Sequence, residues 1–168
     1  GIGYTTTIIY FDPARGGGGD AGGFGGDPDF FAAPNPDSYV GDHSAMRLTD
    51  DQDVTIKMDY LLPTDYLLAS WQVDTLIIPG GTGDMRIGIT TDYGKICAGE
   101  QYDTHDEVQV AGEVAVTSGE IECVTLTNSI TAAAALDLVG MSFTRYGSHI
   151  DDTVDADCYF IGVVIRRP

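Results

Sequence analysis

Two acidic stretches contain the residue types that could bind a cation. The first lies at residues 50–53, and the second carries Asp151, Asp152, Asp155 and Asp157. Calcium takes about six to eight oxygen ligands from carboxylates and backbone carbonyls, often within loops. In an extended segment, residues two apart face the same side. The second stretch therefore has two interpretations, a solvated acidic loop or a weak Ca2+ or Mg2+ site formed by its four aspartates. The glycine and glutamate of an EF-hand loop are missing.

The histidines give no catalytic pattern. His43, His105 and His149 are far apart in sequence, and no serine or cysteine stands beside them in a nucleophile motif. No HxH or HExxH spacing suggests a zinc site. The glycine-rich run at residues 80–83 lacks the lysine and following helix of a phosphate loop, and is expected to be a hairpin turn. We therefore predict that the protein is not an enzyme and has no organic cofactor.

The charge balance restricts the class of partner. The chain has 26 acidic and 8 basic residues, for a formal net charge of -18. Proteins that bind nucleic acid or anionic membranes need clustered lysine and arginine, so both partners are excluded. No apolar run approaches the roughly 20 residues of a membrane span. A charge of this size suits simple solubility, a salty medium where repulsion is screened, or the binding of cations.

The three cysteines do not form a recognisable framework. Cys97, Cys123 and Cys158 are odd in number and include no CxxC pair. We expect buried free thiols within strands. One disulfide with a leftover thiol remains an alternative.

Residues 1–44 differ in composition from the rest and are predicted to form an extended arm. Glycine dominates residues 16–26, and such a stretch has a high entropic cost of ordering. A simple linker would not need aromatic anchors, yet this segment contains several. We take the following residues as candidates for contacting a partner subunit: Tyr10, Phe11, Phe24, Phe30 and Phe31. The arm either lies on a neighbouring subunit or folds back over its own domain.

Residues 45–168 contain short stretches in which apolar and polar residues alternate, which is typical of β-strands. The stretch from Asp53 to Tyr60 alternates cleanly between apolar and polar residues. Further strands are expected at residues 46–48, 71–78, 85–90, 108–110, 113–117, 120–126, 138–145 and 158–165. Glycine, proline and aspartate turns separate them. An alanine-rich run from Ser129 to Leu136 is either a short helix or a loop. This spacing predicts an all-β fold, a jelly-roll β-sandwich preceded by the extended glycine-rich arm.

Several stretches of the second half resemble small jelly-roll proteins of tailed-phage virions. These are the decoration or cement proteins and the fibre-head proteins with a TNF-like sandwich. The likeness lies in a strand ending at a Leu-Pro-x-Asp-Tyr corner and in the last two strands joined by an Asp-Thr loop. It covers residues 54–66, 99–102, 136–145, 148–153 and 159–165. The resemblance implies a homotrimer on the exterior of a capsid or fibre, in contact with the major capsid protein or another virion protein, without catalytic residues.

The favoured function is therefore a structural one, a capsid-decorating or cementing subunit that stabilises the shell through subunit contacts. A first alternative is a receptor- or carbohydrate-binding fibre head, in which the loop aromatics Tyr93, Tyr102 and Tyr146 stack on sugars. A second is an extracellular filament or surface-layer subunit. In that case the segment from Thr5 to Phe11 would complete a neighbour's sheet.

Overall fold

The computed structural model describes residues 7–10, 39–41 and 43–166. Within that part of the chain the regular elements are β-strands and one short 3-10 helix, η3 (Thr127–Ser129). The strands are β1 (Thr7–Tyr10), β2 (Tyr39–Val40), β3 (His43–Ser44), β4 (Met46–Leu48), β5 (Asp53–Leu61), β6 (Gln72–Pro79), β7 (Gly83–Lys95), β8 (His105–Val116), β9 (Glu122–Thr125), β10 (Asp137–Tyr146) and β11 (Cys158–Arg166). No helix among the described residues has the length and hydropathy to cross a bilayer.

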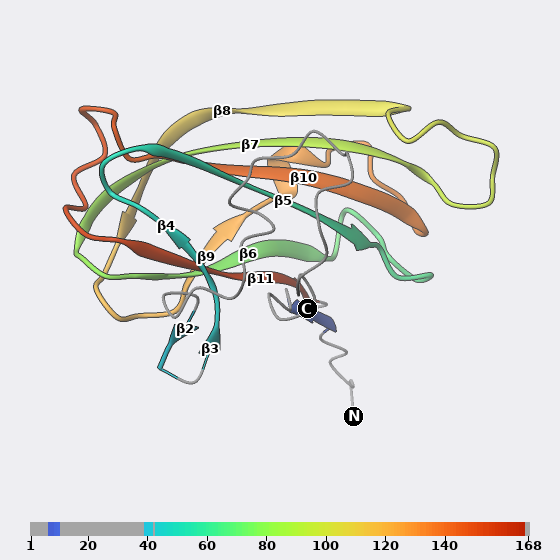
Figure 1. Ribbon diagram of the computed structural model, residues 1–168. Helices are drawn as coiled ribbons and strands as arrows, with labels where there is room; N and C mark the ends of the chain where they lie inside the picture. The colour runs from blue at the N-terminus through green and yellow to red at the C-terminus, as the bar shows by residue number, and fades with distance from the viewer. Residues whose placement is uncertain (1–6, 11–38, 42, 167–168) are drawn as a thin grey trace, which may run out of the picture.

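The strands form a two-layer sandwich, so the prediction of an all-β sandwich is confirmed (Figure 1). One sheet has the order β5-β10-β7-β8. The other has the order β1-β11-β6-β9, with β4 also paired to β11. All pairs within these two sheets are antiparallel. From β4 onward the chain changes sheet at every connection except β7 to β8, which is how a jelly roll brings distant segments into one sheet.

Alternating apolar residues create the core between the sheets. In β5, Ile56, Met58 and Tyr60 are buried while the residues between them are exposed. From the facing layers, Phe143 of β10 and Phe160 of β11 meet with ring centroids 5.3 Å apart. Both rings are fully buried, so this contact joins the two sheets at the centre of the core.

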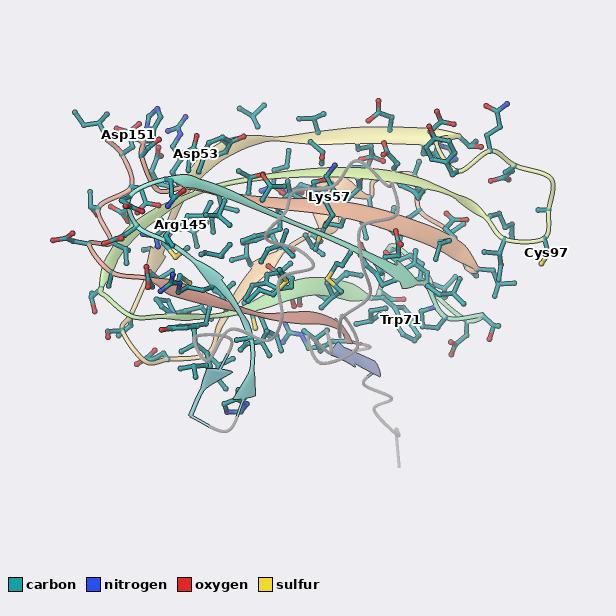
Figure 2. All side chains as sticks on the ribbon, in the orientation of Figure 1. Asp53, Lys57, Trp71, Cys97, Arg145 and Asp151 are labelled. Carbon is teal, nitrogen blue, oxygen red and sulfur yellow. The ribbon has the colours of Figure 1, made fainter. Side chains whose placement is uncertain are left out.

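The two sheets differ on their outer faces. Strands β6 and β11 carry apolar residues on both sides over much of their length, and a second cluster lies on the outer face of their sheet. It contains Ala45, Ile78 and Ile161, with Val40, Leu76 and Tyr159 packed against it. The outer face of β5 instead presents charged residues such as Lys57 (Figure 2). A sheet that is apolar on both faces requires cover from outside the sandwich, whereas the other sheet can face water.

Three local expectations change. The separate strands predicted at residues 108–110 and 113–117 are one strand, β8, in which a bulge places Val110 and Ala111 opposite Gly88. The alanine-rich run after Ser129 is a loop, because its peptide groups bond to neighbouring strands and turns. Strand β7 continues beyond the predicted end at residue 90 as far as Lys95.

The predicted arm lies mostly outside the described residues. Phe11, Phe24, Phe30 and Phe31 are in the segment that the structure does not describe, and only the backbone of Tyr10 is placed, within β1. The predicted boundary between residues 44 and 45 therefore stays a prediction. What the structure adds is a docking position for the start of the arm, since β1 pairs with β11.

Candidate functional site

The acidic loop at residues 147–157 is organised around a buried arginine. Arg145, at the end of β10, is fully buried and forms a two-pronged pair with Asp152. Its Nε donates to Asp152 Oδ2 at 3.0 Å and its Nη2 donates to Oδ1 at 2.8 Å. The remaining donors bind the carbonyl oxygens of Leu48 (3.0 Å), Val154 (2.6 Å) and Ala156 (2.8 Å). A buried guanidinium is tolerated only when it is paired and fully hydrogen-bonded, as here.

The four aspartates of the predicted calcium site do not converge. Asp152 is used by Arg145, and Asp151 accepts from Arg86 Nη1 at 2.9 Å. Asp157 lies 3.4 Å from Arg47, and Asp155 is exposed. Among the described residues, no three histidine, cysteine, aspartate or glutamate side chains form a group able to hold a metal ion. Three of the four carboxylates pair with arginines and the fourth is exposed, so the described structure shows no position that all four share, and the calcium site stays a prediction.

The histidines lie on separate elements. His43 is exposed in β3, and His105 at the start of β8 stacks on Tyr93 with ring centroids 5.0 Å apart. The Nδ1 of His149 lies 3.5 Å from Asp151 Oδ2 in the acidic loop. The three side chains therefore share no common site in the described part of the chain.

A second polar cluster fastens the loop after η3 to β7 and β8. Glu107 of β8 accepts hydrogen bonds from Tyr93 Oη, from Thr131 N at 2.8 Å and from Ala132 N at 3.2 Å. Burial raises the pKa of Glu107, but these hydrogen bonds outweigh it and leave that pKa below its usual value. Burial and the bond to Glu107 raise the pKa of Tyr93. The pair is a structural clasp, with an ionised carboxylate and a neutral phenol.

The hydrogen bonds of the Glu107 clasp should make the free energy of unfolding depend on pH in the acidic range. A lowered folded pKa contributes stability that is present above the unfolded pKa of glutamate and is lost as pH falls through the folded pKa. Glu107→Gln is expected to cost about 1–2 kcal/mol of unfolding free energy at pH 7. That cost should shrink in acid, because the wild-type clasp then loses its charge. Urea unfolding of both proteins at neutral and acidic pH measures it.

The matched control is Glu113→Gln on the same strand. Glu113 is exposed and pairs with Arg86 at 2.6 Å, so its loss should cost at most about 1 kcal/mol. A Glu107→Gln penalty that stays constant from neutral to acidic pH would contradict the assignment of Glu107 as an ionised clasp.

The predicted sugar-binding tyrosines are not brought together. Tyr93 is not a loop residue, since it lies in β7 and is fully buried. Tyr102 is 78% exposed in the loop after β7, beside a hollow of about 210 Å3 that Ile96 and Leu138 also line. Tyr146 lies at the other end of the sheet, where β10 pairs with Asp53. The groove lined by all three is therefore not formed.

The cysteines are free, as expected, but two of them are not buried. Cys158 lies in the core, where burial raises the pKa of its thiol to about 12. Cys97 is exposed in the turn after β7, and Cys123 is exposed on the outward side of the edge strand β9. The prediction of burial is wrong for these two because it takes each cysteine for an inward-facing strand residue.

The feature best suited to a partner is the edge of β11. On the side away from β6, this strand is covered in two pieces. β4 pairs with residues 158–160, and β1 pairs with residues 162–165. The change of partner coincides with a bulge at Gly162, whose φ is 156°. Beyond the bulge, Val163 and Ile165 belong to the core while Val164 faces the other way, so β1 closes a backbone edge next to buried side chains.

Comparisons with known proteins leave the family open. No family model matches the chain, and no curated protein matches it. One solved structure is similar, described as TmCBM61 in complex with beta-1,4-galactotriose. It shares 14% sequence identity and a TM-score of 0.36, covering 79% of this chain and 77% of the other. A likeness of this size establishes neither a family nor a ligand for this chain.

Proposed function

We propose that the protein is a structural subunit that assembles with its own copies by strand donation. In this proposal β1 of one copy occupies the β11 edge of the next. The observation that carries it is the position of β1, a four-residue strand that completes a sheet at its rim. Strand addition of this kind supplies main-chain hydrogen bonds for affinity and side-chain positions for specificity.

The connection between β1 and β2 is long enough for exchange. Residues 11–38 separate the two strands, and 28 residues span at most about 100 Å when extended. Exchange keeps the same β1–β11 contacts whether the strand comes from its own chain or a neighbour. Which strand occupies the β11 edge therefore depends on two concentrations. One is the local concentration of neighbouring copies, and the other is the effective concentration of the chain's own β1, which the length of the connection sets. Copies held close together in a shell or fibre favour exchange.

The finer form of the proposal is the role that the virion resemblance implies. The subunit would decorate or cement a capsid exterior, as a trimer in contact with the major capsid protein. Tyr10 and the phenylalanines at 11, 24, 30 and 31 would then be the anchors of the arm. The buried apolar cluster on the outer face of the β11 sheet supports this form, because such a cluster needs a covering segment on the outside of the sandwich.

A disulfide trap tests strand donation. Ile8 and Val164 are directly opposite in the β1–β11 register, where Cβ atoms lie about 5 Å apart. Ile8→Cys with Val164→Cys, in a chain also carrying Cys97→Ser and Cys123→Ser, should therefore form a disulfide. We expect oxidation at high protein concentration to give covalent dimers and larger species on a non-reducing denaturing gel, in a proportion that rises with concentration.

The control is Ile9→Cys with Val164→Cys, whose partners face opposite sides of the sheet and should not cross-link. If the Ile8–Val164 variant forms its disulfide only within one chain at every concentration, each copy keeps its own strand. That outcome would reject strand donation and leave roles in which single copies act alone, such as the predicted glycan-binding module.

A further inference from the structure

Strand β8 forms an open rim of the other sheet. It is the terminal strand of the order β5-β10-β7-β8, and no described strand pairs with its outer edge. It runs along the top of the molecule in Figure 1. Val108 and Val110 project outward from it and are 66% and 84% exposed. A long edge that carries two exposed valines is a template for pairing with another strand.

The inner side of β8 holds this edge in place. Glu107 binds the loop after η3, and the side chain of Gln109 accepts a hydrogen bond from Ser129 Oγ at 3.0 Å. The strand also pairs with β7 along most of its length. These contacts already order the backbone of β8. Binding of a partner strand would therefore cost little free energy for ordering this edge.

We propose that β8 pairs antiparallel with β8 of a second copy about a twofold axis at Gln109. In this register Val108 of one copy lies opposite Val110 of the other. The twofold axis repeats this contact, so all four exposed valines of the dimer gain an apolar partner. Asp106 faces Gly112 and Glu107 faces Ala111 of the second copy. No acid is opposite an acid, and isologous contacts of this kind are the commonest in homodimers.

The neighbouring registers are worse. An axis at Val110 would pair Val110 with itself but place each Val108 opposite Gly112 of the second copy, which leaves Val108 without an apolar partner. An axis at Val108 would pair Val108 with itself but place each Val110 opposite Asp106, which leaves Val110 without an apolar partner. Shifts by one residue pair an outward side chain with an inward one and are excluded by the pleat. The sequence of β8 is thus self-complementary in one register.

The net charge of -18 makes this pairing dependent on salt. The Debye length is about 30 Å at 0.01 M salt, so two such chains repel each other across the whole interface. At 1 M it is about 3 Å, and the repulsion is screened while valine burial remains. The β8 edge should therefore associate in a concentrated salt medium and separate in a dilute one.

Sedimentation equilibrium of the full chain tests the pairing in sodium chloride at both ionic strengths. We expect a dimer at high salt and a monomer at low salt. Val110→Asp should raise the dimer dissociation constant by about 100-fold, because it places a desolvated charge at each end of the symmetric contact. The control Ile150→Asp makes the same change at a residue that is 90% exposed in the acidic loop, and should leave the dimer intact. A wild-type monomer at high salt, or a Val110→Asp protein that dimerises like wild type, would overturn the proposal.

A single cysteine locates the axis. In the Cys97→Ser, Cys123→Ser background, Gln109→Cys should form a disulfide dimer, since residue 109 is the one position that meets itself. Ala115→Cys, exposed on the same strand but away from the axis, should remain monomeric on the gel. This interface is independent of strand donation, which uses β11. Val110→Asp is expected to leave the Ile8–Val164 cross-link unchanged. A negative result for β8 pairing therefore does not count against strand donation, and the reverse also holds.

Discussion

Replacing Arg145 by methionine is expected to lower the free energy of unfolding by about 3–5 kcal/mol. Removing one partner of a buried ion pair leaves the other charge without compensation, and this costs far more than the pair contributes. Asp152 would be that stranded charge, since its side chain is 1% exposed. The carbonyl oxygens of Leu48, Val154 and Ala156 would also lose their donor. Urea denaturation followed by tryptophan fluorescence measures the change.

Two further variants separate this effect from a general loss of charge. The double variant Arg145→Met, Asp152→Leu should be more stable than Arg145→Met alone, because it removes both charges together. Arg47→Met, which breaks a half-exposed pair with Asp157, should cost at most about 1 kcal/mol. A loss below about 1 kcal/mol for Arg145→Met would show that Arg145 does not hold the acidic loop to the sandwich.

Phe143→Ala should have an effect of similar size, about 3–5 kcal/mol. Phe143 is fully buried and packs on Phe160 of the opposite sheet, so truncation leaves a cavity where the two layers meet. The same denaturation experiment checks the value. Leu138→Ala on the same strand is the control, because Leu138 is 44% exposed and should cost much less.

A double-mutant cycle with Phe143→Leu and Phe160→Leu isolates the contact between the rings. Aromatic pairs contribute about 0.5–1.5 kcal/mol beyond their area burial. We expect a coupling energy in that range. A coupling near zero would show that the two sheets do not meet at these rings, which would contradict the sandwich as described.

The periodicity of the sequence is enough to predict the sandwich but not all of its strands. The cleanly alternating stretch that forms β5 is predicted almost to the residue, because one of its faces is buried and the other meets water. The strand predicted for β7 stops at residue 90, whereas β7 continues to Lys95. Tyr93 is therefore expected in a loop, although it lies in the core. The bulge in β8 makes one strand look like two.

The sequence does not reveal what the acidic residues bind, because their partners lie on strands outside the acidic run. Asp151 and Asp152 resemble ion ligands because they stand in a run of acidic residues. Their partners are Arg86, 65 positions from Asp151, and Arg145, which precedes the loop. Only the folded arrangement of the strands reveals those pairings. The arm residues, by contrast, remain predictions, because all but Tyr10 lie outside the described part of the chain.

The most direct test of strand donation mixes two chains that each carry one engineered cysteine. One has Ile8→Cys and the other Val164→Cys, both with Cys97→Ser and Cys123→Ser, so a disulfide between positions 8 and 164 must join two molecules. Strand donation predicts a covalent heterodimer after concentrated mixing and oxidation, identified by intact mass. If no heterodimer forms while the chain carrying both cysteines closes its own disulfide, β1 belongs to its own domain and the proposed assembly is contradicted.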